Sequence, residues 1–175
     1  MRRWRRMDPW GFRQVFTGFM VLAGSTMAAV VVVFAGRGLA AGTVHGRDGL
    51  TMAGALPILG VWLTFAFRMH LTGIYVNDEG LRLRHIVRTR TFRWSEVNGF
   101  EARPALFLGE PTVRDACWVR TTGGAFESAV QRRSREMGWR KDVGPVLAPD
   151  DFARMLARLD AERASRHDGP QVVRR

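Results

Sequence analysis

Two long apolar runs near the N-terminus constrain this chain more than any other feature, because neither contains a charged residue. The first covers residues 15–36 and the second covers residues 49–67. A helix needs about 20 such residues to cross a hydrocarbon core about 30 Å thick. Each run has this length, so the sequence predicts a transmembrane hairpin over residues 15–69, preceded by a basic cytoplasmic arm at residues 1–14.

The arginine distribution gives the hairpin an orientation. Residues 1–13 carry five arginines, the segment 37–48 between the runs carries two, and five more follow over residues 68–90. Basic residues of short loops gather on the cytoplasmic side of a membrane. We therefore expect a multi-pass protein of the plasma membrane with both termini in the cytoplasm. Trp4 and Trp10 lie among the first arginines, as expected of a membrane-interface anchor.

Two alternatives to this arrangement stay open. A basic start, an apolar run and the small residues at 38–41 are also features of a cleaved signal peptide, although a signal has an apolar core of only about 7–15 residues. Gly24 and Ala28 form a pair of small residues at helical spacing, which lets two helices pack closely in lipid. We expect this pair to join the two spans, and Gly54 to offer a second close approach, with a homodimer contact as the alternative.

The residues after the hairpin alternate with a period of two. Leu81, Leu83 and Val87 are expected on a buried face, while the arginines between them are expected on a wet face. This pattern predicts a β-hairpin that turns at residues 78–80. Further strands are predicted at 91–94, 97–102, 116–120 and 125–129, with a bulge at Gly99 and a tight turn over residues 121–124.

The last predicted element is a helix. Pro149 and the two aspartates that follow suit a helix start, and Phe152, Met155, Leu156 and Leu159 then form one apolar stripe. Antiparallel strands closed by one amphipathic helix are the plan of a pleckstrin-homology (PH) type domain. The predicted fold is thus a two-helix transmembrane hairpin, a mainly antiparallel β PH-like barrel or sandwich at residues 70–165 closed by a C-terminal α-helix, and a disordered tail at 166–175.

Residues 73–84 (GIYVNDEGLRLR) and 91–97 (TFRWSEV) carry a family resemblance. They resemble the bacterial PH-like domains of actinobacterial membrane proteins, such as the low-molecular-weight protein antigen 6 type. In that family a two-span hairpin precedes a GV-x-V-x-x-x-G-L-R-V-R hairpin and a W-x-x-I strand. The resemblance is clearest over residues 72–103 and weakens over Gln131–Leu147, which we interpret as an insertion. It implies a fold more than a function, since most members have no assigned activity.

Arginines supply the candidate contact residues. We expect Arg82, Arg84 and Arg93 on the outer face of the first strands and Arg88 and Arg90 at the turn between them. Arg132 and Arg133 open a second basic stretch, which continues to Arg140, Lys141 and the neighbouring Trp139. The preferred hypothesis is a non-enzymatic interaction or scaffold module for an unknown protein partner at the cytoplasmic face. The alternative is a sensor of anionic lipid head groups, since each basic residue near a membrane contributes about 1 kcal/mol of attraction.

The sequence offers no catalytic, metal or cofactor site. The histidines at positions 45, 70, 85 and 167 lack the spacing of metal ligands, and the single cysteine, Cys117, has no local base beside it. Residues 70–175 carry a net charge of only +5, whereas nucleic-acid binding usually needs a denser basic footprint. We therefore expect no enzyme activity, no metal, no cofactor and no nucleic-acid partner.

Overall fold

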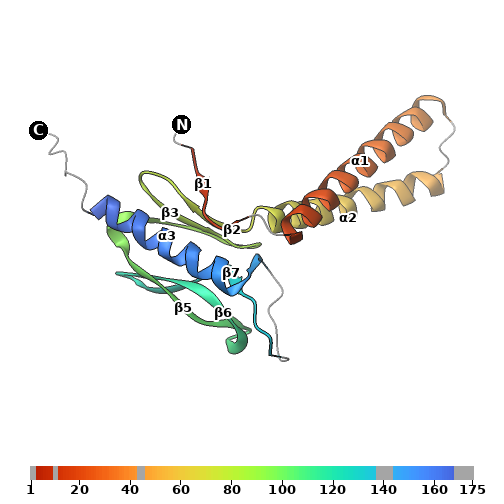
Figure 1. The fold of residues 1–175 in the computed structure, drawn as a ribbon. Coiled ribbons are helices and arrows are strands. Elements are labelled where there is room, and N and C mark those ends of the chain that lie inside the picture. Colours follow the sequence, from red (N-terminus) through yellow and green to blue (C-terminus); the bar gives the residue numbers. More distant parts are fainter. Residues whose placement is uncertain (1–2, 10–11, 43–45, 137–143, 168–175) are drawn as a thin grey trace, which may run out of the picture. The chain divides into compact units, whose positions relative to one another are not determined.

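The structure is a computed structural model that describes residues 3–9, 12–42, 46–136 and 144–167. It contains two compact units, a helix pair at residues 12–70 and a β-rich domain (Figure 1). The domain is discontinuous in sequence, because it comprises residues 1–11 together with 71–175. The chain therefore starts in the domain, leaves it for the helix pair and then returns.

The helix pair consists of α1 (Phe12–Ala40) and α2 (Gly46–His70), so both predicted apolar runs are helical. Residues Val15–Gly38 of α1 are long and apolar enough to cross a membrane, with a mean hydropathy of 2.2. In α2 the apolar part among the described residues is the shorter Leu56–His70. One candidate membrane span is thus present in the structure, and a second crossing by α2 stays a prediction.

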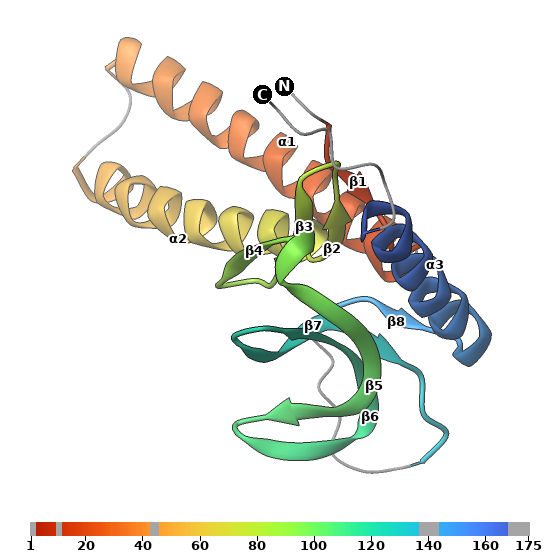
Figure 2. The same ribbon diagram turned by 90° about the vertical axis from the view of Figure 1, so that its left-hand side faces the viewer.

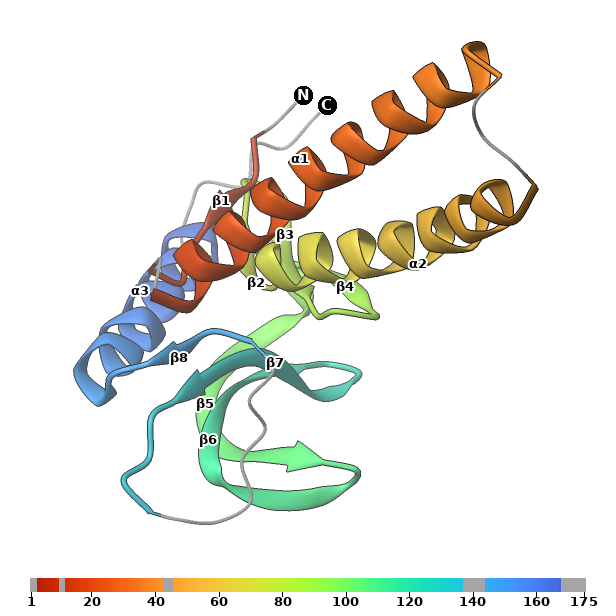
Figure 3. The same cartoon turned by 90° about the vertical axis from the view of Figure 1, so that its right-hand side faces the viewer.

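A glycine lets the two helices pack together. Gly24 of α1 is buried, and a Cβ atom at this position would collide with Trp62 and come within 3.0 Å of the Leu63 side chain of α2. The predicted packing of the two helices at Gly24 is therefore confirmed, and Figure 3 shows them side by side. The same prediction for Gly54 is wrong, because a Cβ there would meet no atom of the described structure within 4 Å.

The domain is built from two four-stranded sheets. The first has the antiparallel order β1 (Arg5–Arg6), β2 (Gly73–Val76), β3 (Gly80–Arg84) and β4 (Thr89–Arg93). A 3-10 turn, η1 (Trp94–Glu96), leads to the second sheet, which has the order β5 (Val97–Phe107), β6 (Glu110–Thr121), β7 (Gly124–Arg132) and β8 (Val146–Leu147). The helix α3 (Pro149–His167) packs along the sheets (Figure 2).

The core lies between the sheets and α3, and it follows the predicted periodicities. The first sheet contributes Leu81 and Leu83 at alternate positions of β3, while α3 contributes three of the four residues of its predicted apolar stripe. The fourth, Leu156, is partly buried against the same core. The buried core residues are Ile74, Val76, Leu81, Leu83, Trp94, Val97, Cys117, Val119, Val130, Leu147, Phe152, Met155 and Leu159.

Several predicted boundaries differ from the observed ones. The strand expected at 97–102 continues to Phe107, with the expected irregularity at Gly99. The predicted insertion is shorter than Gln131–Leu147, because Gln131 and Arg132 belong to β7 and pair in parallel with β8. The helix α3 extends into the predicted tail as far as His167. Trp139, Arg140 and Lys141 lie outside the described residues.

Val87 does not take the buried position that the alternation predicted. Its side chain is 79% exposed, because β3 ends at Arg84 and the chain turns over residues 85–88. This turn is closed by a hydrogen bond from the His85 N–H to the Arg88 carbonyl, with an N–O distance of 2.8 Å. The alternation of buried and exposed residues therefore ends with β3, and Val87 lies beyond it in the turn.

The N-terminal arm, residues 3–9, is part of the domain. Arg5 and Arg6 form β1, in register with Val76 and Tyr75 of β2, and the Met7 N–H donates to the Ile74 carbonyl at 2.9 Å. The sequence predicted only a basic membrane-proximal arm for this segment. The strand was missed because two arginines give no periodic signal and resemble the basic flank of a membrane span.

Asp8 fastens the arm through a buried carboxylate. Its Oδ1 accepts the Ile74 N–H at 2.9 Å, and its Oδ2 accepts Nε and Nη2 of Arg6 at 2.8 and 2.6 Å. Arg6 Nη2 also donates to the Thr72 carbonyl at 2.9 Å. Burial raises the pKa of Asp8, and the charge of Arg6 offsets part of that effect. Gly73 makes room for the carboxylate, since a Cβ there would collide with it.

We predict that Asp8→Ala lowers the free energy of unfolding of the domain by about 3–5 kcal/mol, because it leaves Arg6 and the Ile74 N–H buried without their partner. The control is Asp8→Asn, which keeps an oxygen for the Ile74 N–H and should lose less. Urea unfolding of the full chain in detergent, followed by tryptophan fluorescence, measures both. Losses below about 1 kcal/mol in both variants, the range of an exposed ion pair, would show that the arm is not docked.

Cys117 gives a second test of the core. The thiol is fully buried, and this burial raises its pKa from 9.0 to about 12. It should therefore resist iodoacetamide at pH 8 in the folded chain and react once urea is added, as measured by mass spectrometry. Because the thiol ionises more easily in the unfolded chain, its contribution to stability should be lost as the pH rises above 9.0. Rapid labelling without urea would contradict this core.

Candidate functional site

The seven arginines proposed as contacts occupy three separate places. Arg82, Arg84 and Arg93 lie on one face of the first sheet, since Arg82 and Arg93 are in register with Thr91 and Gly80 of neighbouring strands. Arg90 is in register with the buried Leu83 and therefore points to the opposite face, which the sequence did not predict. Arg90 and Arg88, which lies in the β3–β4 turn, line one hollow and form the second place. Arg132, the last residue of β7, and Arg133 directly after it form the third.

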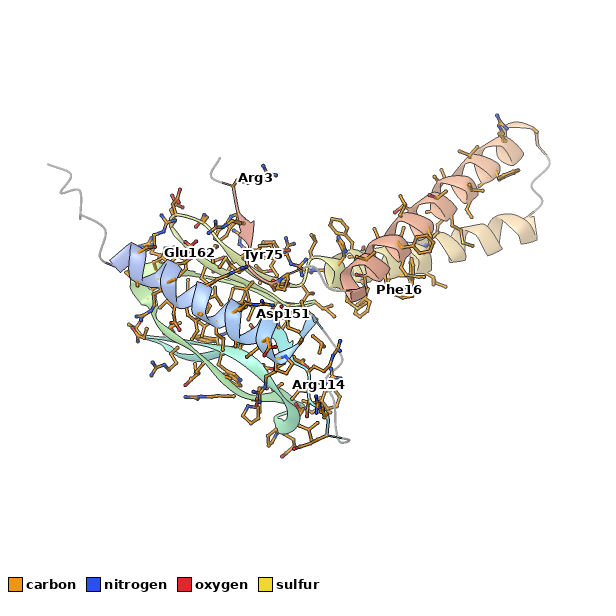
Figure 4. All side chains as sticks on the ribbon, in the orientation of Figure 1. Arg3, Phe16, Tyr75, Arg114, Asp151 and Glu162 are labelled. Carbon is orange, nitrogen blue, oxygen red and sulfur yellow. The ribbon has the colours of Figure 1, made fainter. Side chains whose placement is uncertain are left out.

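The outer face of the first sheet is engaged by the protein's own aromatic residues. The guanidinium of Arg82 lies 4.0 Å from the ring centroid of Trp4 in the arm. The guanidinium of Arg84 lies 5.8 Å from the ring centroid of Tyr75, which Figure 4 labels on β2. In such a cation–π contact, the negative face of the aromatic ring attracts the guanidinium. Trp4, which the sequence assigned to a membrane interface, therefore covers part of the predicted ligand face instead.

A groove of about 560 Å³ lies between β4 with its preceding turn and the strands β6 and β7. Figure 2 labels β4, β6 and β7, of which β4 belongs to the first sheet and the other two to the second. We call this groove the β4–β7 groove, and it is lined by His85, Ile86, Val87, Arg88, Arg90, Leu106, Trp118, Ala125, Phe126, Glu127 and Ala129. Its lining is therefore mainly apolar, and it includes the cations Arg88 and Arg90.

Stacked side chains shape this groove. The guanidinium of Arg90 lies 4.5 Å from the ring centroid of Phe126, and the Phe126 ring packs on Phe92 with 5.0 Å between centroids. Nε2 of His85 lies 2.9 Å from the Glu127 carbonyl oxygen and ties the turn to β7. These contacts hold Arg90 at the groove surface, on the side of the sheet where the core residues lie.

The groove carries an excess of positive charge. Arg88 and Arg90 are both exposed, and neither has a carboxylate partner among the described residues. Glu127 is the acidic side chain in the groove lining, and its Oε1 accepts the Leu106 N–H at 3.3 Å. The groove can therefore attract an acidic group, and its apolar wall can contact an apolar one.

The third place, at the end of β7, holds carboxylates beside its arginines. Arg132 forms an ion pair with Asp115 of β6. Arg132 and Arg133 line a polar hollow of about 470 Å³ that also contains Glu136. Arg135 lines it as well, so three arginines face two carboxylates here and Arg132 is already paired with Asp115.

The structure describes no grouping that points to catalysis. Within its described ranges, no group of three or more His, Cys, Asp or Glu side chains is placed to hold a metal ion. His85 is committed to the Glu127 carbonyl, and the raised pKa of buried Cys117 keeps that thiol protonated near neutral pH.

Comparison with known proteins supports the PH-like fold. Residues 73–158 match the family model for the bacterial PH domain. Comparison with curated proteins and with solved structures gives no significant match. The matched segment begins at the first residue of β2 and ends within α3, so it includes both sheets except β1. PH domains are generally non-catalytic modules that bind proteins or lipids.

A double-mutant cycle tests the docking of the arm on the outer face. Because the Arg82 guanidinium stacks on Trp4, Arg82→Met and Trp4→Leu should be coupled by about 0.5–1 kcal/mol in the free energy of unfolding. Urea unfolding of the two single variants, the double variant and the unchanged chain gives this coupling energy. Additive effects would show that the two side chains do not interact, and Arg82 would then be available to a ligand.

Proposed function

We propose that this chain is a membrane-anchored interaction module without enzyme activity. Two membrane-spanning helices would hold a PH-like domain at the cytoplasmic face of the plasma membrane. The candidate span Val15–Gly38 supports membrane attachment, and the bacterial PH match supports an interaction role. A narrower relation to the antigen 6 type and a homodimer stay predictions.

The pairing of β1 with β2 carries the proposal of two crossings. The chain passes through α1 and α2 between these strands, yet the strands are hydrogen-bonded neighbours, about 5 Å apart. Paired strands must lie on the same side of a membrane. If α1 crosses, the chain must therefore cross back before Gly73, and α2 is the helix available in that interval. This supports a hairpin with both ends on one side.

The arginines and the arm support the cytoplasmic side for both ends. Five arginines precede the apolar part of α1, and basic flanks favour the cytoplasm. Cleavage of a signal peptide after residues 38–41 would remove β1 and Asp8 from the domain. The buried Ile74 N–H would then lose its acceptor and the sheet would lose a strand. The structure of the arm therefore favours an uncleaved membrane span.

The β4–β7 groove is the interaction surface that we favour. Trp4 of the arm covers Arg82 on the outer face, whereas Arg88 and Arg90 line an open groove, where Arg90 stacks on Phe126 and neither has an acidic partner among the described residues. A protein partner is our first proposal. An anionic-lipid sensor is the second candidate, and it is favoured by one observation. Val87 is 79% exposed beside Arg88, and such an apolar tip with a basic neighbour suits the surface of an anionic membrane.

Cysteine labelling tests the proposed membrane topology. In a Cys117→Ala background, Gly42→Cys and Ser165→Cys place single thiols in the connection between the helices and on α3, at exposed positions. A membrane-impermeant maleimide should label Gly42→Cys in intact spheroplasts, and should label Ser165→Cys only after the membrane is opened. Labelling of Ser165→Cys in intact spheroplasts would contradict the cytoplasmic placement. Failure to label Gly42→Cys, while a denatured sample is labelled, would contradict the two crossings.

A further inference from the structure

The strand β4 ends the first sheet, and no strand of the described structure pairs with its other edge. Two hydrogen bonds define the pattern of its pairing with β3. The His85 N–H donates to the Arg88 carbonyl at 2.8 Å, and the Trp94 N–H donates to the Glu79 carbonyl at 3.3 Å. In antiparallel strands, hydrogen-bonded pairs alternate with pairs that are not hydrogen-bonded. Counting between these two pairs, Arg90 and Phe92 direct their backbone polar groups to β3.

Thr89 and Thr91 therefore direct their N–H and C=O groups away from the sheet. Both residues are exposed. At the next outward position, the N–H of Arg93 is already bonded to Oε2 of Glu96 at 2.9 Å. The free edge thus offers a short ladder of backbone donors and acceptors at Thr89 and Thr91, and the Glu96 carboxylate ends it.

The charge of this edge selects what can pair with it. Residues 88–93 contain three arginines and no acidic residue. A second copy of the strand would bring arginines close to arginines, and like charges across paired strands are destabilising. Basic side chains on an edge strand protect it against such self-pairing. Residues 137–143 and 168–175 are also net basic, so these segments of the chain do not match the edge in charge.

We propose that the free edge of β4 binds an extended acidic segment of a partner protein as an added strand. Its backbone would bond to Thr89 and Thr91, as peptides do when they extend a sheet. Side chains on its inner face would enter the β4–β7 groove, where an acidic group meets Arg88 and Arg90 and an apolar group contacts Phe126. This inference rests on the proposed interaction function and names the partner class and the site.

Peptide binding to the full chain in nanodiscs of phosphatidylcholine tests the charge selection. The probe is a labelled ten-residue peptide that alternates Glu and Val, and its matched control alternates Lys and Val. Fluorescence anisotropy should show that the acidic peptide binds at least about tenfold more tightly. Arg90→Glu should remove most of this difference. Equal binding of the two peptides would overturn the proposal.

A proline variant tests strand addition itself. The Thr91 N–H faces the free edge, so Thr91→Pro removes a donor that β4 offers to the added strand and leaves the β3–β4 ladder unchanged. The matched control Thr91→Val keeps the N–H. The acidic peptide should bind Thr91→Pro about tenfold more weakly than Thr91→Val, and should slow hydrogen exchange at the Thr91 amide of the unchanged chain. Equal affinity for the two variants, or no slowing, would overturn the proposal.

Anionic vesicles separate this inference from the lipid alternative. Phosphatidylglycerol vesicles that bind through Arg88 and Arg90, while the acidic peptide does not bind, would make the groove a lipid site and overturn strand addition. Cysteine labelling measures the proposed topology independently of any ligand. A hairpin confirmed by labelling, together with absent peptide binding, would thus reject the strand-addition site alone.

Discussion

The buried carboxylate of Asp8 joins two segments of the chain, one that precedes the helix pair in the sequence and one that follows it. Burying a charge costs several kcal/mol unless it is paired and hydrogen-bonded, and here Arg6 and the Ile74 N–H supply both partners. The docked arm adds β1 to the first sheet of the domain. The proposed membrane topology depends on the pairing of β1 with β2, since paired strands cannot lie on opposite sides of a membrane.

Docking of the arm also divides the arginines by role. On the outer face of the first sheet, Arg82 stacks on Trp4 of the arm and Arg84 lies over the ring of Tyr75. Arg88 and Arg90 lie instead beside a groove and an unpaired strand edge. Among the described residues, neither Arg88 nor Arg90 forms an ion pair with a carboxylate. A stretch that looks uniformly basic in sequence therefore contains both structural and available cations.

The sequence predicted those parts of the fold that depend on local periodicity. Burial of Leu81 and Leu83 follows from alternation, and burial of Leu159 follows from helical spacing, because each pattern exposes one face to the core. It could not predict β1, since a two-residue strand has no period and its partner lies about 70 residues away. The sequence also failed to predict that the Arg90 side chain points to the core side of the first sheet, for a related reason. This orientation depends on where the turn after β3 falls, and that turn was placed a few residues late.

Hydrogen exchange at the Met7 amide of the unchanged full chain in lipid nanodiscs shows whether the arm is docked as β1. This N–H bonds to the Ile74 carbonyl only when the arm is docked as β1. The account predicts that Met7 exchanges far more slowly than an unstructured amide and that its protection falls together with that of Ile74 as denaturant is added. Exchange of Met7 at the rate of a free tail, while Ile74 stays protected, would contradict it.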